Sequence, residues 1–88
     1  MANILLVEND QATLAKLAEI LDHAGHQSQA CASVDEAIVQ NLDDFDAIIS
    51  NLRLPGQPGT ELIKHTATPV LISTSYASMR SAIDATKT

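Results

Sequence analysis

Short apolar runs and amphipathic stretches alternate along the chain, which predicts strands alternating with helices. Ile4–Val7 is a continuous apolar run, typical of a strand buried on both faces of a parallel sheet. Apolar residues then recur at helical spacing over Leu14–Leu21. Asp10 is a candidate N-cap for this helix, and Gly25 is a candidate stop. The chain is therefore predicted to open with a strand followed by an amphipathic helix.

The same alternation continues to residue 73, and a last helix is expected over Ala77–Thr88, where apolar residues again follow helical spacing. The elements predicted between these points are an edge strand over Gln27–Ala32, a helix opened by the capping box Ser33–Glu36, a buried strand over Ala47–Ile49, a chain break over Pro55–Gly59, a short helical stretch over Glu61–His65 and a strand over Pro69–Ser73. Strands that alternate with helices favour a parallel sheet with right-handed crossovers. The predicted fold class is therefore α/β.

Composition narrows the class of protein. The 88 residues predict a single small domain over residues 1–88, and 45% of them are apolar, so disorder is not expected. The net charge of −6 repels a phosphate backbone, which argues against nucleic acid as a partner. Cys31 has no second cysteine with which to form an internal disulfide, and the N-terminus lacks the features of a secretory signal. We expect a cytoplasmic protein that does not interact with membranes.

The most informative residue is Asn51, which follows the buried strand over Ala47–Ile49. The carboxyl ends of the strands are where open α/β sheets place their ligands and chemistry. An aspartate at this position could bind a metal or accept a phosphoryl group. The amide of Asn51 does neither well, because its oxygen is uncharged and its nitrogen is a poor nucleophile. His23 and His26 could together contact one metal, but favourable interaction with the negative end of the helix is the preferred explanation.

Three segments of the chain, Ile4–Asp10, Ser50–Gly56 and Pro69–Thr74, resemble the receiver domain of two-component response regulators. The resemblance implies a flavodoxin-like open parallel sheet, for which the family order is 2-1-3-4-5. Because the family's fifth strand and lysine have no counterpart before Thr88, the expected sheet has four strands in the order 2-1-3-4. The fold expected is therefore a C-terminally shortened receiver in which the fifth strand and the last helix are missing.

The resemblance also assigns positions within the site. It places Glu8 on the first acidic position, Asn9 on the second, Asn51 on the phosphoacceptor position and Thr74 on the switch hydroxyl. Two of the three acidic positions are thus occupied by neutral amides, which can hydrogen-bond each other, Glu8 or nearby backbone. Mg²⁺ prefers carboxylate oxygens, so its binding is expected to be weak or absent. No catalytic residue, metal ligand or cofactor is expected.

The function that this resemblance implies is a phosphorylation-independent signalling module of a two-component pathway, acting as a decoy or antagonist rather than as an enzyme. Expected partners are a histidine kinase, a phosphotransfer domain, another response regulator, or a second copy that pairs through the exposed edge of Val70–Ser73. Three alternatives stay open from the sequence: an active receiver phosphorylated on another acid, a fragment of a longer response regulator, and a small flavodoxin-like ligand-binding domain.

Overall fold

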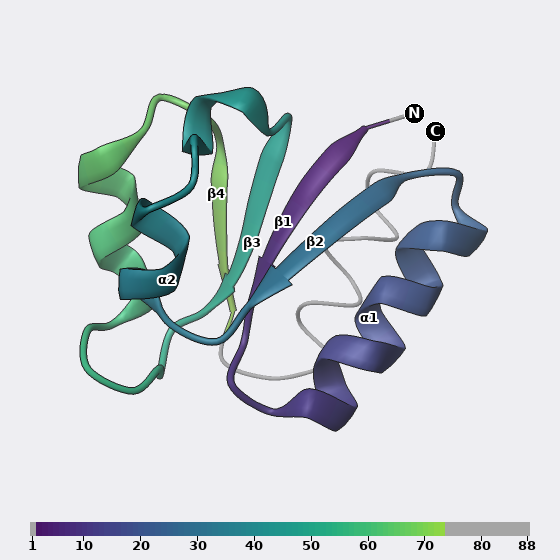
Figure 1. Cartoon of the computed structure of the whole chain (residues 1–88), viewed down its shortest axis with the longest axis horizontal. Coiled ribbons are helices and arrows are strands. Elements are labelled where there is room, and N and C mark those ends of the chain that lie inside the picture. The colour runs from purple at the N-terminus through teal and green to yellow at the C-terminus, as the bar shows by residue number, and fades with distance from the viewer. Residues whose placement is uncertain (1, 74–88) are drawn as a thin grey trace.

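The computed structural model describes residues 2–73, in which strands alternate with helical segments (Figure 1). The strands are β1 (Asn3–Val7), β2 (Gln27–Cys31), β3 (Ala47–Asn51) and β4 (Val70–Ser73). The helices are α1 (Gln11–His23) and α2 (Val34–Ile38), and the 3₁₀ segments are η1 (Leu42–Asp44) and η2 (Gly59–His65).

The described strands form one parallel sheet in the order β2-β1-β3-β4, as predicted. The register aligns the ends of the strands, because Val7 of β1 lies opposite both Cys31 of β2 and Ser50 of β3. Asn51 is the last residue of β3 and lies beside Ser73 of β4. The residues that follow β1 and those that end β3 therefore meet at the carboxyl edge of the sheet.

Two apolar layers cover the sheet, because successive strand residues point to opposite faces. In β1, Leu5 and Val7 face one layer, whereas Ile4 and Leu6 face the other. The first layer is completed by side chains of α2, η1 and η2, and the second by three leucines of α1. Those leucines are Leu14, Leu17 and Leu21. The predicted core positions Ile4–Val7 of β1 and the three leucines of α1 are buried, and Ala18 of α1 is partly buried.

Both ends of α1 follow the sequence prediction. Asp10 is the N-cap, and its carboxylate accepts a hydrogen bond from the Thr13 backbone N–H at 3.2 Å. After the helix, Gly25 adopts φ +86°, a conformation that L-residues rarely adopt. The N–H groups of Gly25 and His26 then donate to the carbonyls of Asp22 and Leu21, which forms a Schellman cap. The entry and exit of α1 are thus fixed by local chemistry.

Two helical details differ from the sequence expectation. η2 is a 3₁₀ segment that begins at Gly59, two residues before the predicted start at Glu61. The turn η1 was not predicted at all, and Asn41 supports it by donating to the carboxylate of Asp44 at 2.9 Å. The helix expected over Ala77–Thr88 lies outside the described residues. Of the helices that the structure describes, none has the length and apolar character needed to cross a membrane.

Candidate functional site

Glu8 is a buried carboxylate at the carboxyl end of β1, with a relative exposure of only 4%. Its backbone N–H donates to the carbonyl of Cys31 at 3.0 Å, which continues the pairing of β1 with β2 by one residue. One carboxylate oxygen, Oε1, accepts the backbone N–H of Asp10 at 3.1 Å. The side chain is therefore held at the edge of the sheet by the first turn that leads into α1.

Asn51 supplies the partner of the second oxygen. Its amide nitrogen Nδ2 donates to Glu8 Oε2 at 2.7 Å, a short hydrogen bond of the kind that a charged acceptor makes. Its amide oxygen Oδ1 accepts the backbone N–H of Arg53 at 3.1 Å. Both polar atoms of this side chain are thus paired, and the bond to Glu8 joins the ends of β1 and β3.

The other two positions named from the resemblance behave differently. Asn9 is exposed, and within residues 2–73 no hydrogen bond of its side chain is found, so the two amides do not pair with each other. Thr74 lies outside the described residues. The structure therefore brings Glu8 and Asn51 together and leaves Asn9 facing solvent.

Sequence reasoning missed two residues that support Asn51. Ser50 is fully buried and donates its hydroxyl to the Asn51 carbonyl at 2.9 Å. Gly59 packs so closely that a Cβ there would lie 2.3 Å from the Asn51 carbonyl oxygen and 2.5 Å from Ser50 Oγ. The Gly59 N–H also donates to the carbonyl of Leu52 at 2.9 Å, which closes the loop after β3. The sequence signal was Gly59 itself, which was interpreted as part of a chain break.

The arrangement of a buried acid at the end of β1 and a polar residue at the end of β3 agrees with comparisons to known proteins. A family model described as the response regulator receiver domain matches residues 4–88. The chain belongs to the receiver-domain family.

Individual relatives of this receiver domain agree with that assignment. The response regulator protein FleR of Pseudomonas aeruginosa is 32% identical over 90 residues, covering 96% of this chain and 19% of FleR. The non-phosphorylated HemR receiver domain of Leptospira biflexa is 27% identical, with a TM-score of 0.72 over 82% of this chain and 63% of that one.

A putative response regulator of Chloroflexus aurantiacus is 30% identical, with a TM-score of 0.70 over 81% of this chain and 65% of that one. This receiver domain therefore spans about a fifth of the FleR chain and less than two thirds of either solved chain. The matches support the receiver fold and leave the activity of any longer protein unspecified.

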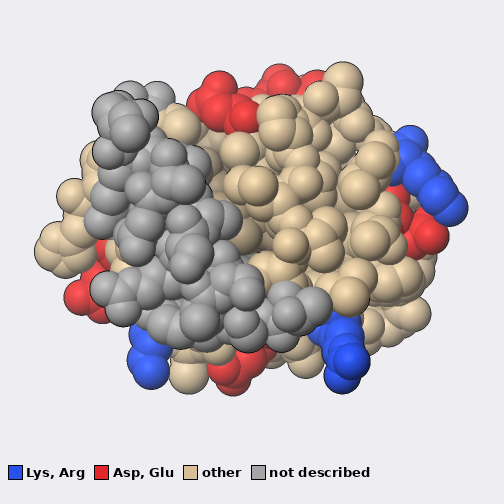
Figure 2. Space-filling view, turned by 180° about the vertical axis from the view of Figure 1, so that it is seen from behind, with Lys and Arg blue, Asp and Glu red and all other residues tan. Residues whose placement is uncertain are grey.

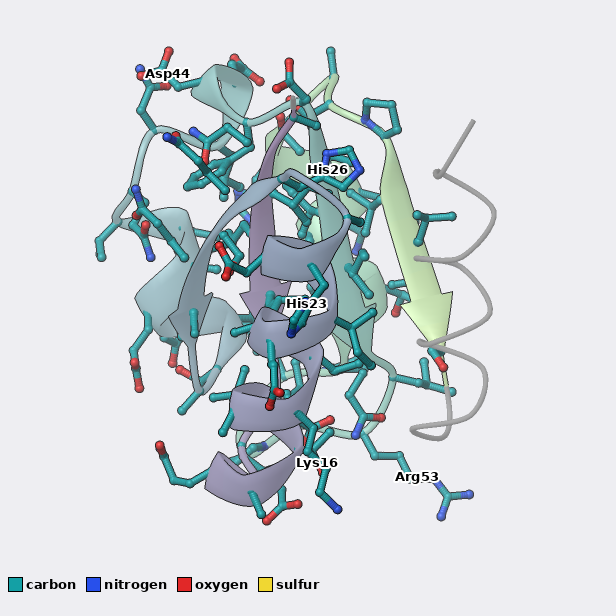
Figure 3. All side chains as sticks on the ribbon, turned by 90° about the vertical axis from the view of Figure 1, so that its right-hand side faces the viewer. Lys16, His23, His26, Asp44 and Arg53 are labelled. Carbon is teal, nitrogen blue, oxygen red and sulfur yellow. The ribbon has the colours of Figure 1, made fainter. Side chains whose placement is uncertain are left out.

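Charged side chains around the site distinguish the two ends of this receiver domain. Lys16 on α1 and Arg53 after β3 lie toward the end at which the strand arrows point, whereas His26 and Asp44 lie at the opposite end (Figure 3). His23 Nε2 lies 3.8 Å from the Glu19 carboxylate on α1. His26 Nδ1 instead accepts the Ala2 backbone N–H at 3.0 Å, so the two histidines have separate environments.

Two titratable groups near the carboxyl edge have shifted pKa values. Hydrogen bonds from the Thr13 hydroxyl and backbone N–H lower the pKa of Asp10, which favours the charged form of this N-cap. Burial, together with the negative charge of Glu36, raises the pKa of the Cys31 thiol to about 11. Cys31 is therefore a neutral residue that packs within the apolar layer.

Proposed function

We propose that this receiver domain acts as an interaction module of a two-component pathway and does not accept a phosphoryl group at position 51. The observation that carries the proposal is the 2.7 Å hydrogen bond from Asn51 Nδ2 to the buried carboxylate of Glu8. An amide nitrogen occupies the place from which a carboxylate oxygen would attack phosphorus, and it is a poor nucleophile. Asn51 therefore links the end of β3 to Glu8 after β1 and does not act as a phosphoacceptor.

The donor set at this edge also suits Mg²⁺ poorly. Glu8 is a single carboxylate, Asn51 turns its nitrogen toward that carboxylate, and Asn9 is neutral. Two carboxylates about 5 Å apart repel each other by about 3 kcal/mol at an effective dielectric of 20, and a bound cation offsets that repulsion. The two amides remove the repulsion and with it the need for the ion. We therefore propose that the carboxyl end of the sheet folds stably without bound magnesium or any other cofactor.

The surface around the site supports a docking role. Lys16, Arg53 and Lys64 are the lysine and arginine side chains of residues 2–73, and two of them lie at the carboxyl end of the sheet (Figure 3). Lys16 lies on the exposed side of α1, next to Ala12 and Ala15. A histidine kinase, a phosphotransfer domain or another response regulator with an acidic face would complement this end. Such a partner would be occupied without receiving or donating phosphate, which makes the module a decoy or antagonist in the cytoplasm.

Phosphoryl transfer is tested with a small-molecule phosphodonor and Mg²⁺, using intact-mass spectrometry. We expect no mass gain at position 51 and no magnesium-dependent rise in melting temperature. The matched variant is the double substitution Asn9→Asp and Asn51→Asp, which restores two acids. We expect this variant to gain thermal stability with magnesium. Phosphate mapped to the wild-type segment 50–53 would contradict the proposal.

Docking is tested by competition, in which a kinase phosphorylates its own receiver while this chain is titrated in. Inhibition should scale with the concentration of the chain over its dissociation constant, and micromolar affinity is typical of transient interfaces. Lys16→Glu and Arg53→Glu should weaken inhibition because they reverse charges at the carboxyl end. Lys64→Glu, on η2, is the matched control and should compete like the wild type. If all three variants compete equally well, the docking surface lies elsewhere.

A second candidate function is that of a regulatory segment within a longer response regulator. The observation that favours it is the match to FleR, of which this chain covers 19%. An active receiver phosphorylated on another acid would instead show a mass gain that survives Asn51→Ala. The phosphodonor experiment therefore separates the active receiver from the proposed module, and sequencing of the gene beyond codon 88 tests the longer regulator.

A further inference from the structure

His26 lies in the turn between α1 and β2, and its side chain reaches the start of β1. The ring nitrogen Nδ1 accepts the backbone N–H of Ala2 at 3.0 Å. The Ala2 carbonyl accepts the backbone N–H of Gln27 at 2.8 Å, which begins the pairing of β1 with β2. Both backbone groups of Ala2 are thus held by the segment 26–27, and one of the two contacts depends on an imidazole, a group that titrates near neutral pH.

This geometry determines which nitrogen of His26 carries the proton. A neutral imidazole has one N–H and one acceptor nitrogen, so a ring whose Nδ1 accepts the Ala2 N–H carries its proton on Nε2. Nε2 is buried, and no hydrogen-bond partner for it is found within residues 2–73. A second proton can enter the ring only at Nδ1, where it would place two N–H groups against each other. Protonation of His26 therefore ends the contact with Ala2.

Charged groups on the surrounding elements do not prevent that protonation. The negative end of α1 lies three residues before His26 and favours a positive charge, and β2 carries no charged residue. His23 Nε2 lies 3.8 Å from the Glu19 carboxylate, which balances any charge that His23 gains. The charged or titratable residues of α1 and of the turn before β3 that lie toward this end are Glu19, Asp22, His23 and Asp46, and all are exposed. Solvent screens such groups, and the back of the molecule likewise carries its charges at the margins of a broad uncharged area (Figure 2).

The other side of β1 is held by contacts that include no imidazole. The Asn3 N–H donates to the Asp46 carboxylate at 2.7 Å, and the Asp46 N–H donates to the Asn3 carbonyl at 2.8 Å. Loss of the His26 contact therefore leaves Asn3 joined to the segment before β3. It loosens only the side of β1 that faces β2.

We infer that His26 is a pH-sensitive switch that joins the start of β1 to the start of β2. The contact is closed when Nδ1 is unprotonated and opens as pH falls through the range in which histidine ordinarily titrates. The sign follows from linkage, because the open form binds the additional proton and the closed form does not. His26 lies at the opposite end of the sheet from Lys16 and Arg53 (Figure 3), so this inference goes beyond the proposed docking function and does not depend on it.

Ring-nitrogen NMR shifts test the closed form. At about pH 8, where histidine is ordinarily neutral, His26 should carry its proton on Nε2 and show an accepting Nδ1. His23 is the internal control, because its side chain is 76% exposed and should exchange between the two tautomers. A His26 ring that carries its proton on Nδ1 at this pH would overturn the inference.

Amide exchange, corrected for the intrinsic rate at each pH, tests the opening. Protection of the Gln27 amide should fall about fivefold between about pH 8 and about pH 5, as expected for the loss of one hydrogen bond. The Asp46 amide, which is paired with Asn3, should keep its protection. His26→Asn supplies an acceptor oxygen that does not titrate and should remove the pH dependence at Gln27, whereas His23→Asn should retain it. Constant Gln27 protection in the wild type, or an equal fall in His26→Asn, would overturn the inference.

Discussion

The carboxyl end of the sheet and the outer side of β4 arrange their polar groups differently. At the carboxyl end, both oxygens of buried Glu8 accept hydrogen bonds, and both polar atoms of Asn51 are paired. Along β4, Val70 and Ile72 point their backbone groups away from the sheet, beside partly exposed Leu71. The carboxyl end is thus held together by hydrogen bonds among its own side chains and backbone, whereas β4 is joined to the described sheet through its β3 side. The difference predicts that substitutions at Asn51 cost more stability than substitutions at Leu71.

The largest expected effect follows from Asn51→Asp, which would replace the donor in the 2.7 Å contact with a second carboxylate. Repulsion beside buried Glu8 and the loss of its partner should lower the free energy of unfolding by about 3 kcal/mol at neutral pH. For a domain of this size the melting temperature should fall by more than about 10 °C. Thermal unfolding followed by circular dichroism measures the change.

The pH dependence distinguishes repulsion from simple loss of a bond. Two carboxylates in contact raise the pKa of the pair, so the deficit of Asn51→Asp should shrink as pH falls and one of them is protonated. Asn51→Ala is the control, because it leaves Glu8 with a missing donor but adds no charge, so its loss should be smaller and should change less with pH. Equal losses for both variants at every pH would show that the loss comes from the missing hydrogen bond and that charge repulsion adds nothing to it.

The second largest loss of stability is expected at Gly59, whose close approach helps to position Asn51. A methyl group there would meet the Asn51 carbonyl oxygen at 2.3 Å, so the loop after β3 must move in Gly59→Ala. We expect a loss of about 2 kcal/mol. Gly56→Ala is the matched control: Gly56 has φ +83° but open space around it, so its cost is conformational and should be about 1 kcal/mol. Denaturant unfolding of both variants gives the comparison.

Comparison of sequence with structure shows which kinds of residue can be predicted. The run Ile4–Val7, the cap at Asp10 and the stop at Gly25 were predicted, because periodicity and capping depend on neighbours in sequence. The location of Asn51 at the end of β3 was predicted for the same reason. The turn η1 was missed, since a 3₁₀ turn of three residues carries almost no periodic signal.

The missed parts of the site depend on contacts between distant segments. The approach of Gly59 to Asn51 brings two loop ends together, and glycine gives no sign in sequence of what it lies against. Asn9 and Asn51 are the same residue type at the ends of two neighbouring strands, yet only Asn51 bonds Glu8 within the described residues. Which amide turns inward depends on the direction of the backbone after each strand, and the sequence pattern does not specify it.

A smaller effect is expected at Cys31, which ends β2 beside the backbone of Glu8. Its pKa is raised to about 11 in the folded protein, above the usual value of about 8.5. The thiol should therefore react slowly with iodoacetamide at pH 8 in the native state and quickly in urea. Because the unfolded thiol ionises first, stability from this group is full below about pH 8.5 and declines as pH rises toward 11. Cys31→Ala should lack this part of the alkaline decline.

The smallest expected effect on folding is at Leu71, and it separates the two regions most clearly. Leu71→Thr places a β-branched strand former at a position that is already 38% exposed, so the free energy of unfolding should change by less than about 1 kcal/mol. Asn51→Ala should cost more, because it leaves the buried carboxylate of Glu8 without the donor that Asn51 supplies. Denaturant unfolding of the two variants gives the comparison, and equal losses would show that the contact between Asn51 and Glu8 contributes no more than the partly exposed side chain of Leu71.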